Sequence, residues 1–395
     1  MNVLFLMISY PDVRQQNKSL YSDLVDEFAR NGNNVYVVAP VLNKRKESME
    51  IEGLATVLRI KTPELFNTNP IMKGIANLML PLIFRKAIRR SLKNIHFDLV
   101  ITPTPPITFV SVVKWLKKGF GAKFYLILRD IFPQNAKDLG LVHNNFVYNF
   151  FRKKEIDLYK TADKIGCMSQ GNINFIKLHN PNIEVGKLHL LPNWETPTPY
   201  SIPSLEMKKK YGFEGKYIAV FGGNIGRPQQ LEFVLELAER KKTNENIVFL
   251  IIGNGTERQR IENIAKEKDL SNIVFKNMIS RDDYNELLKE CEVGLICLNE
   301  KFTIPNIPSK TLSYFNAKIP VLAAVDKNTD YGQLLEDSES GFWSITGDVD
   351  AYERNFDLLY NDEALRNKMG ENGNKYLNKY LTSEIAYKTI LLNIN

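Results

Sequence analysis

Cysteine and histidine are scarce in this 395-residue sequence, and it contains no long hydrophobic run. The three cysteines are an odd number without the spacing of a disulfide framework, so we expect a reducing, cytoplasmic compartment. The four histidines form no HxxH or HExxH motif, and no zinc site is expected. No stretch reaches the roughly 18–20 apolar residues that a membrane-spanning helix needs.

Length and composition indicate a globular protein of two domains, with 44% hydrophobic and 25% charged residues. The charge is unevenly distributed. Residues 1–195 hold 27 Lys and Arg against 16 Asp and Glu, whereas the remaining residues hold 25 against 29. This asymmetry predicts a polyanionic partner for the first half, which is a nucleic acid, a membrane surface or a phosphorylated substrate.

Two apolar segments of the first half have different interpretations. Asn2–Ser9 lacks a preceding charged region and ends at strand length, so we predict a strand and not a signal peptide. Ile71–Phe84 contains a lysine and a proline and runs into the basic segment Arg85–Lys93. It is predicted either to lie on an anionic membrane or to be a core helix with a solvated basic end, and both interpretations stay open.

Continuous apolar runs alternate with helical segments along most of the chain. The predicted strands of the first half are Val3–Ile8, Val35–Ala39, Thr56–Ile60, Asp98–Thr102, Phe124–Leu128, Lys164–Met168 and Lys187–Leu191. Those of the second half are Tyr217–Phe221, Ile247–Ile252, Ile273–Phe275, Val293–Leu298 and Val321–Ala324. Such runs are typical of parallel strands covered on both faces, and we predict an α/β fold. The proline-rich segment 193–203 is the expected linker between two Rossmann-like domains, and the sequence after Asp348 is helical.

Glycines follow the predicted strand Tyr217–Phe221. The segment Phe221–Pro228 contains Gly222, Gly223 and Gly226, then Arg227. Backbone amides at such a turn cradle phosphate, and an arginine adds a planar charge. The alternative is a tight turn whose glycines serve packing alone. The spacing matches neither the GxGxxG nor the GxxxxGK[ST] motif, so neither a nicotinamide site nor a P-loop is expected.

Two further segments of the second half are each predicted to open a helix. Gly253-Asn254-Gly255 follows the next predicted strand. A proline-rich loop, residues 300–308, leads to a helix that starts with Ser309 and Lys310. A hydroxyl, free amides and an ammonium group there suit a diphosphate, and ordinary N-capping by Ser309 is the alternative.

Six segments carry a resemblance to a known family. They are Arg129–Pro133, Pro192–Trp194, Gly223–Arg227, Pro308–Lys310 with Tyr314, Lys318–Ala323 and Leu365–Tyr376. In this order they resemble the GT-B glycosyltransferases of family 4, over nearly the whole chain. The resemblance is closest to the bacterial subgroup that adds N-acetyl-L-fucosamine or related amino sugars in O-antigen and capsule synthesis.

The resemblance implies two Rossmann-like domains facing a cleft. Residues 1–192 would bind the acceptor and residues 204–376 the nucleotide sugar, with 377–395 as a helical tail that returns to the first domain. The implied donor-binding residues are Gly222, Gly223, Asn224, Gly226, Gly253, Asn254, Gly255, Ser309, Ser313 and Tyr314. The implied catalytic residues are Arg227, Lys310, Asp130 and Glu300, and the implied acceptor-binding residues are Lys18, Pro105 and Arg129.

The sequence departs from the family at four places. The usual Glu-x7-Glu pattern has Pro308 eight residues after Glu300, and Ser313 by alignment. Gln229 and Gln230 stand near the place of a lysine that usually follows the phosphate-binding arginine. The segment 15–18 (Gln-Gln-Asn-Lys) replaces an amino-terminal glycine loop, and Arg129 stands where a histidine is common.

The implied reaction is retaining transfer from a UDP-sugar to an undecaprenyl-diphosphate-linked saccharide, at the inner face of an anionic membrane. Arg227 and Lys310 would stabilise the leaving diphosphate in place of a metal, and no cofactor is expected. Asp348 and Asp350 form a DxD sequence, which could bind Mg²⁺. A helix is predicted to start there, however, and this favours Asp348 as an N-cap. Asp130 would orient the acceptor.

Two other functions are alternatives. A sugar-nucleotide 2-epimerase would share the two-domain architecture. A nucleic-acid-binding protein would explain the basic first half, but the sequence shows no recognition helix, RNP pattern or zinc module, so no nucleic acid is expected.

Overall fold

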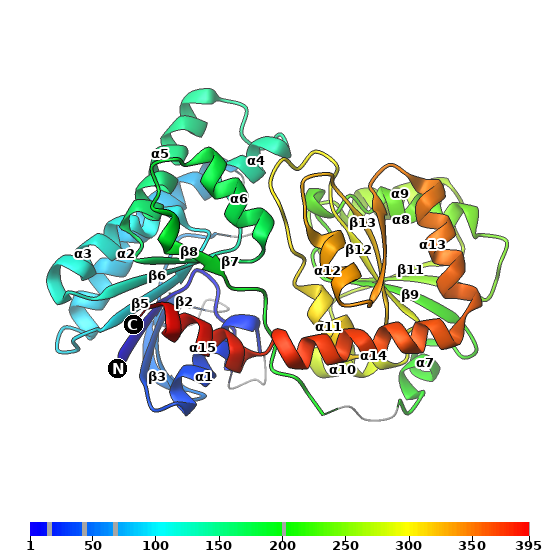
Figure 1. Cartoon of the computed structure of the whole chain (residues 1–395), viewed down its shortest axis with the longest axis horizontal. Coiled ribbons are helices and arrows are strands. Elements are labelled where there is room, and N and C mark those ends of the chain that lie inside the picture. Colours follow the sequence, from blue (N-terminus) through cyan, green and yellow to red (C-terminus); the bar gives the residue numbers. More distant parts are fainter. Residues whose placement is uncertain (14–17, 42–45, 66–69, 200–202, 395) are drawn as a thin grey trace. The chain divides into compact units, whose positions relative to one another are not determined.

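The computed structural model describes residues 1–13, 18–41, 46–65, 70–199 and 203–394. The chain divides into two compact units (Figure 1). Unit 1 consists of Met1–Pro192 and Ser383–Asn395, and unit 2 of Asn193–Thr382. Within the described ranges, no helix combines the length and the apolar character that crossing a membrane requires.

Unit 1 contains an eight-stranded sheet in the order β3-β4-β2-β1-β5-β6-β7-β8. The strands are β1 (Asn2–Leu6), β2 (Asn34–Pro40), β3 (Ser48–Glu52), β4 (Ala55–Ile60), β5 (Leu99–Pro103), β6 (Lys123–Leu128), β7 (Lys164–Cys167) and β8 (Leu188–Leu190). All neighbours are parallel except β3, which pairs antiparallel with β4 at the edge. The apolar runs that predicted the other strands are largely buried, except at the edge strand β8, and the parallel strand order confirms an α/β fold.

Helices cover both faces of this sheet (Figure 1). They are α1 (Leu20–Arg30), α2 (Pro70–Ser91), α3 (Val110–Phe120), α4 (Gln134–Asp138), α5 (Asn145–Thr161), α6 (Gln170–His179) and α15 (Ser383–Ile394). Helix α1 begins where Ser19 and Ser22 form a capping box, and its buried Phe28 packs edge-to-face on Phe5 and Tyr387. Tyr387 lies on α15, so the carboxyl-terminal helix completes the core of unit 1.

The return of the chain to unit 1 begins later than the expected residue 377. Helix α14 (Glu363–Tyr380) continues through that position as part of unit 2. It ends where Leu381 and Thr382 contact the backbone of Glu195. Helix α15 then packs on α1, β6 and β7 of unit 1, and Lys123 Nζ donates to the carbonyl of Ile394 over 2.6 Å.

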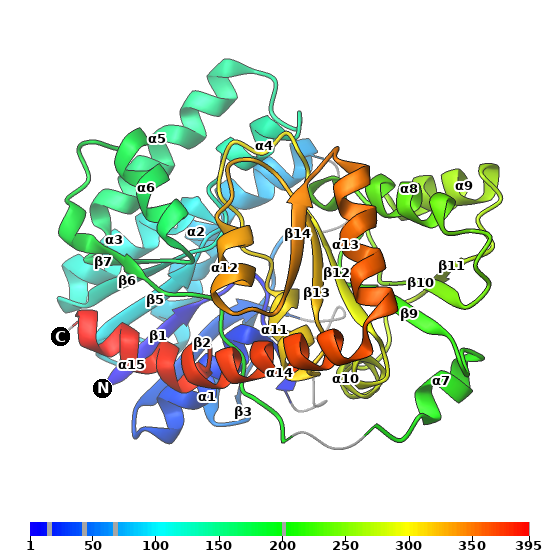
Figure 2. The same ribbon diagram turned by 45° about the vertical axis from the view of Figure 1, so that its right-hand side comes forward.

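Unit 2 contains a six-stranded parallel sheet in the order β11-β10-β9-β12-β13-β14. The strands are β9 (Tyr217–Gly222), β10 (Ile247–Ile252), β11 (Ile273–Lys276), β12 (Val293–Cys297), β13 (Val321–Val325) and β14 (Gly341–Ile345). The helices are α7 (Glu206–Tyr211), α8 (Glu232–Arg240), α9 (Arg258–Glu267), α10 (Arg281–Lys289), α11 (Lys310–Asn316), α12 (Tyr331–Asp337), α13 (Val349–Asn361) and α14. Helices α8, α9 and α13 lie on one face, and α11, α12 and α14 on the other (Figures 1 and 2).

The expected linker 193–203 is not solvent-exposed at its start. Asn193, Trp194 and Glu195 are buried. Asn193 Nδ2 donates to the carbonyl of Ile307 over 2.8 Å, and Glu195 accepts from Arg281 over 2.8 Å. These residues therefore belong to the packed part of unit 2, while residues 200–202 lie outside the described residues.

Candidate active site

The sheet of unit 2 reverses its strand order between β9 and β12. The ladder between them covers two residue pairs, Val293–Ala219 and Gly294–Val220. Tyr314 inserts beside this ladder, with its hydroxyl 3.3 Å from the carbonyl oxygen of Val220. In doubly wound sheets, ligands bind beyond the carboxyl ends of the strands at such a reversal. We therefore expect a ligand site at the loops that follow β9 and β12.

The structure corrects the expected donor contact of Tyr314. This side chain is fully buried, and its hydroxyl lies 3.1 Å from the carbonyl oxygen of Leu295 on β12. Gly294 makes room for it, because a Cβ there would lie 2.4 Å from the tyrosine ring. Tyr314 thus supports β9 and β12 from inside the sheet and does not face a ligand.

The loop after β9 rests on the loop after β10. Gly223 N donates to the carbonyl of Ile252 over 2.8 Å, and Ile225 N to that of Asn254 over 2.9 Å. A Cβ at Gly253 would lie 1.8 Å from the carbonyl oxygen of Gly223, and this glycine has φ +148°. Gly253 and Gly255 are therefore needed for close backbone packing.

The glycine loop itself is partly occupied by its own side chains. Gln229 Oε1 accepts from the backbone N–H of Gly226 over 3.1 Å and from the Asn224 amide over 3.2 Å. Gly222 is buried against Tyr284, whose hydroxyl would lie 2.0 Å from a Cβ at Gly222. The exposed part of the loop is Gly223–Asn224, so Gly222 and Gly226 shape the loop from behind.

The α-helix that follows this loop does not begin directly at it. Arg227–Gln229 form a 3-10 turn with Pro228 in its first turn. Gln230 then adopts φ +41°, and α8 begins only at Glu232. The terminus of α8 is therefore separated from the glycines, and any charge at the loop comes from side chains.

Lys310 provides such a charge. Its Nζ lies 4.3 Å from the ring centroid of Phe221, and a Cβ at Gly223 would lie 3.8 Å from this nitrogen. In the described part of the chain, no carboxylate pairs with it. Burial lowers the pKa of Lys310 to about 8, because the charged form is desolvated. The ammonium group is thus placed at the one exposed glycine of the loop.

Arg227 is a second cation at the loop, but it is differently placed. Its side chain is 54% exposed, and its Nε lies 3.5 Å from Glu257 Oε1. Asn299, which follows β12, donates to the carbonyl of Arg227 over 2.9 Å. Glu257 and Gln229 could not be predicted as partners here, because both lie on turns whose path depends on the neighbouring loop.

Ser309, Ser313 and Glu300 lie around the start of α11 and the end of β12. Ser309 is exposed, and its side chain makes no N-cap hydrogen bond, so the capping alternative is wrong for it. Ser313 is half-buried on α11. Glu300 is exposed, its backbone N–H donates to Gln230 over 3.0 Å, and its Oε2 would lie 3.7 Å from a Cβ at Gly347.

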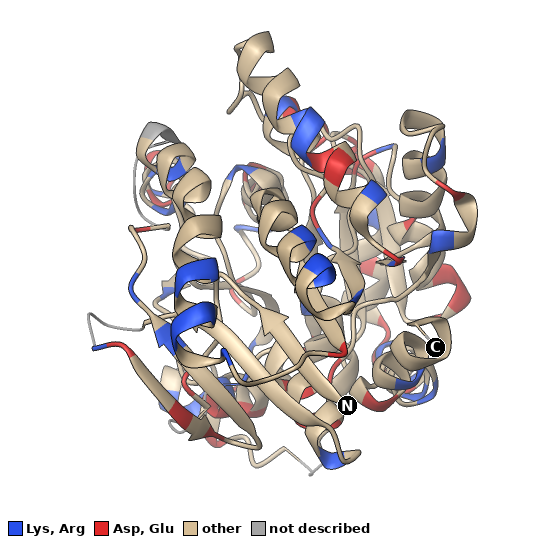
Figure 3. Ribbon diagram, turned by 90° about the vertical axis from the view of Figure 1, so that its left-hand side faces the viewer, with Lys and Arg blue, Asp and Glu red and all other residues tan. Residues whose placement is uncertain are grey.

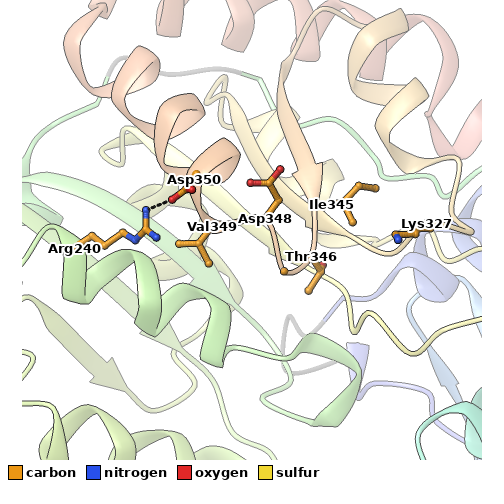
Figure 4. A pocket seen from close by; sticks show the side chains of 8 residues that line it. Arg240, Lys327, Ile345, Thr346, Asp348, Val349 and Asp350 are labelled. Carbon is orange, nitrogen blue, oxygen red and sulfur yellow. Dashed lines mark hydrogen bonds and ion pairs between the residues drawn. The ribbon is translucent and has the colours of Figure 1, made fainter.

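A cavity of about 510 Å³ lies at the loop that contains Gly347 (Figure 4). Its lining comprises Arg240, Lys327 and residues 345–350. Asp348 Oδ1 accepts from the backbone N–H of Ala351 over 2.9 Å, which confirms the predicted N-cap. Asp350 pairs instead with Arg240 over 2.6 Å, so the two aspartates serve different contacts. Arg227 and Lys310 are not among the lining residues.

Unit 1 brings its own candidate residues together. The backbone N–H of Arg129, after β6, donates to Thr104 Oγ1, after β5, over 2.9 Å. This bond joins Arg129 and Asp130 to the segment that contains Pro105. The Arg129 guanidinium is hydrogen-bonded to Tyr21, in the first turn of α1 that follows Lys18.

The candidate residues of unit 1 differ in how exposed their side chains are. Arg129 is buried, and it holds α1 against β6; a direct acceptor contact by this residue is not supported. Asp130 and Lys18 are exposed, and Pro105 is half-buried. The segment 15–17 lies outside the described residues.

The sequence of unit 2 matches a known family over most of its length. Residues 204–376 match the model of the glycosyl transferases group 1. The chain is therefore similar to the group 1 glycosyltransferases over this segment. The glycine loop, Lys310 and Arg227 all lie within it.

Two curated glycosyltransferases are similar to the chain beyond this segment. Probable glycosyltransferase WbjE of Pseudomonas aeruginosa is 23% identical over 291 residues, covering 71% of this chain and 70% of that protein. Putative colanic acid biosynthesis glycosyl transferase WcaI of Escherichia coli strain K12 is 25% identical over 299 residues, covering 72% and 71%.

Solved GT-B glycosyltransferases share the fold of the whole chain. One such structure, Anabaena Alr3699/HepE in complex with UDP, matches with a TM-score of 0.68 and 12% identity, covering 99% of each chain. The fold of the chain is therefore GT-B, as the resemblance implied.

Proposed function

We propose that this chain is a retaining glycosyltransferase that transfers a sugar from a UDP-sugar to a lipid-diphosphate-linked saccharide. The observation that carries the proposal is the position of Lys310. Its ammonium group lies beside the exposed Gly223, at the strand-order reversal of the segment that is similar to the group 1 glycosyltransferases. A cation without a carboxylate partner among the described residues suits a diphosphate, whose charge grows as the sugar departs.

In the proposed reaction, the acceptor hydroxyl attacks the anomeric carbon from the face that the diphosphate leaves. The bond from that carbon to the β-phosphate oxygen breaks, a bond to the acceptor oxygen forms, and the hydroxyl proton passes to the departing phosphate. Lys310 and Arg227 stabilise the developing negative charge without a metal ion. Asp130 orients the acceptor, and Glu300 contacts the donor sugar.

The identity of the substrates is proposed from similarity. Alr3699/HepE was solved with UDP, which supports a UDP-sugar as donor. The name of WcaI refers to colanic acid biosynthesis, which supports a role in capsule or O-antigen polysaccharide. The motifs of the N-acetylfucosamine transferases favour an N-acetylated amino sugar. An undecaprenyl-diphosphate-linked saccharide suits the basic residues 1–195.

Nucleotide release tests this function. The purified full chain is incubated with a panel of UDP- and GDP-sugars in EDTA, with and without short lipid-diphosphate saccharides. We expect UDP release that needs both one amino sugar donor and an acceptor. Conversion of the donor alone to its 2-epimer, or no binding of any nucleotide sugar, would contradict the proposal.

Gly253→Ala is expected to weaken UDP binding by about tenfold or more, because the new methyl group displaces the carbonyl of Gly223. Calorimetric titration with UDP measures the change. Gly119→Ala is the matched control, since its Cβ would meet no atom within 4 Å. Equal UDP affinity of the Gly253→Ala variant and the unchanged chain would show that the loop position does not matter for binding.

A further inference from the structure

Helix α11 carries Lys310 at its first position, but its own sequence stabilises it poorly. The helix has seven residues, Lys310–Asn316, and among the described residues Ser309 forms no N-cap bond with its side chain. An isolated helix of this length is unstable in water, so tertiary contacts determine where it lies. The position of the Lys310 ammonium group beside Gly223 therefore depends on what holds the two ends of α11.

The start of α11 is held from two directions. Asn193 is buried, and its Nδ2 donates over 2.8 Å to the carbonyl of Ile307 in the loop that leads to the helix. In the first turn, the hydroxyls of Thr311 and Tyr331 lie 2.6 Å apart, and both residues are buried. Asn193 thus fixes the backbone just before the helix, and Tyr331 fixes the first turn itself.

The end of α11 is held by one amide side chain. Asn316 is buried, and its Nδ2 donates to Thr198 Oγ1 over 2.8 Å. Its Oδ1 accepts from the backbone N–H of Thr198 over 3.2 Å. A buried amide that loses a partner keeps an unsatisfied polar group, so these two bonds favour one position for the end of the helix.

Asn193 and Thr198 belong to the same short segment, residues 193–198, which begins the predicted linker. This segment is itself fixed in unit 2. Glu195 pairs with Arg281 on α10 over 2.8 Å, and its backbone N–H donates to the carbonyl of Leu381, which follows α14. Helices α10 and α14 also contact α11. One segment therefore contacts both ends of α11 and is tied to the two helices beside it.

We propose that the 193–198 segment positions Lys310 for sugar transfer by holding both ends of α11, with Asn193, Thr198 and Asn316 as positioning residues. All three act through the helix and its connecting loop, so their loss is expected to lower the rate of transfer more than the binding of the acceptor. A displacement of about 1 Å at a reacting group lowers a rate by up to about 100-fold. The inference rests on the proposed function, because it assigns the residues that orient the cation at the leaving group.

The titration of Lys310 reports on its position independently of transfer. Burial lowers the pKa of Lys310 to about 8, so a shift of α11 that admits water would raise this pKa. Asn193, Thr198 and Asn316 are neutral. Among the described residues, the titratable group that acts on the Lys310 charge is the thiol of Cys297 on β12. Burial raises the pKa of this thiol to about 12, so it stays neutral up to about pH 10.

Thr198→Val tests the end of the helix. Valine keeps the shape of threonine at this exposed position, but it removes the oxygen that accepts from Asn316. We expect kcat for nucleotide release to fall by about three- to tenfold, with the KM of the acceptor unchanged. Thr161→Val is the matched control, because its Oγ1 donates to the carbonyl of Asp157 within α5 of unit 1, the unit that Figure 3 faces.

Asn193→Ala tests the start of the helix, because the Ile307 carbonyl loses this donor. We expect kcat to fall by about tenfold or more. Labelling with acetic anhydride between pH 7 and 10, read by mass spectrometry at Lys310, is expected to show a midpoint about one pH unit higher than in the unchanged chain. Asn272→Ala is the matched control, since this buried amide donates over 2.9 Å to the carbonyl of Ala238 on α8.

Circular dichroism and urea denaturation measure the folded fraction of each sample, and kcat is expressed per folded molecule. Thr198→Val and Asn193→Ala remove different bonds but affect the same helix, so a common effect points to α11. Unchanged kcat in both variants, an unchanged labelling midpoint in Asn193→Ala, or equal changes in the control variants would overturn the inference.

The labelling also separates this inference from the proposed function. A raised midpoint in Asn193→Ala, together with no sugar transfer by the unchanged chain, would reject only the proposed function. Sugar transfer by the unchanged chain, with the same kcat and the same midpoint in the variants, would reject only the positioning role of the 193–198 segment.

Discussion

Replacement of Lys310 by methionine is expected to lower kcat/KM for sugar transfer by about 10²–10³-fold. Methionine keeps an apolar side chain of similar length, but it removes the ammonium group that lies over the Phe221 ring and beside Gly223. The loss arises mainly in kcat if the ammonium group acts on the departing diphosphate. Initial rates of nucleotide release with the best donor and acceptor measure both parameters.

The pH dependence of UDP binding gives an independent measurement on the same group. Burial lowers the pKa of Lys310 to about 8, so the free protein loses this charge as the pH rises through 8. Since the diphosphate binds the protonated form, the Kd of UDP is expected to rise about tenfold for each pH unit above 8. Below pH 7 the lysine is charged in both states, and its contribution to the pH dependence disappears.

Lys310→Arg is the control for the charge. The guanidinium group stays protonated to much higher pH, so the rise of Kd above pH 8 is expected to disappear in this variant. A methionine variant with unchanged kcat/KM, or an arginine variant that keeps the steep rise, would refute the assignment of Lys310. Arg227 would then be the candidate for the charge at the leaving group.

Arg59→Met is expected to destabilise unit 1 by about 3–5 kcal/mol. Arg59 forms a bidentate ion pair with Glu52. Its Nε lies 2.9 Å from Oε1, and its Nη2 lies 2.6 Å from Oε2. It also donates to the carbonyls of Tyr10 and Pro11, and both members of the pair are buried. Removal of the guanidinium leaves a buried carboxylate without its counter-charge, and this penalty exceeds the loss of the hydrogen bonds.

Urea denaturation followed by circular dichroism measures the free energy of unfolding. Lys388→Met is the matched control, because Lys388 pairs with Glu384 on the exposed side of α15 in the same unit. Its removal is expected to leave the free energy of unfolding almost unchanged, because solvent screens an exposed pair. An equal effect of the two substitutions would show that the burial of the Arg59–Glu52 pair has no energetic consequence.

Strand positions were predictable from the sequence wherever strands are covered on both faces. The runs at Val35–Ala39 and Ile247–Ile252, for example, correspond to β2 and β10. The two strands that were missed, β3 and β14, lie at sheet edges. Residues of β3 alternate in polarity and are mostly exposed, while β14 is half-buried and begins with glycine. Weak burial leaves no continuous apolar run in β3 and β14, so the pattern misses them, whereas it found the edge strands β8 and β11.

The candidate site was predictable as a set of loops but not as a set of contacts. The glycines after β9 and the lysine at the start of α11 are visible in the sequence, and the structure brings Lys310 to Gly223. The burial of Tyr314 was not predictable, because it depends on the space that Gly294 leaves on a strand distant in the sequence. For the same reason, sequence alone did not distinguish the exposed Gly223 from Gly253, which supports the loop from beneath.

The completion of unit 1 by α15 has a consequence for synthesis on the ribosome. Helix α15 packs on α1, β6 and β7, but all of unit 2 is translated between them (Figure 1). At about 5–20 residues per second, this delay lasts roughly 10–40 seconds. During that time Phe28 lacks the ring of Tyr387 that later covers it. The part of the protein that is made first is therefore finished last, and nascent chains stalled within unit 2 expose an apolar surface to chaperones.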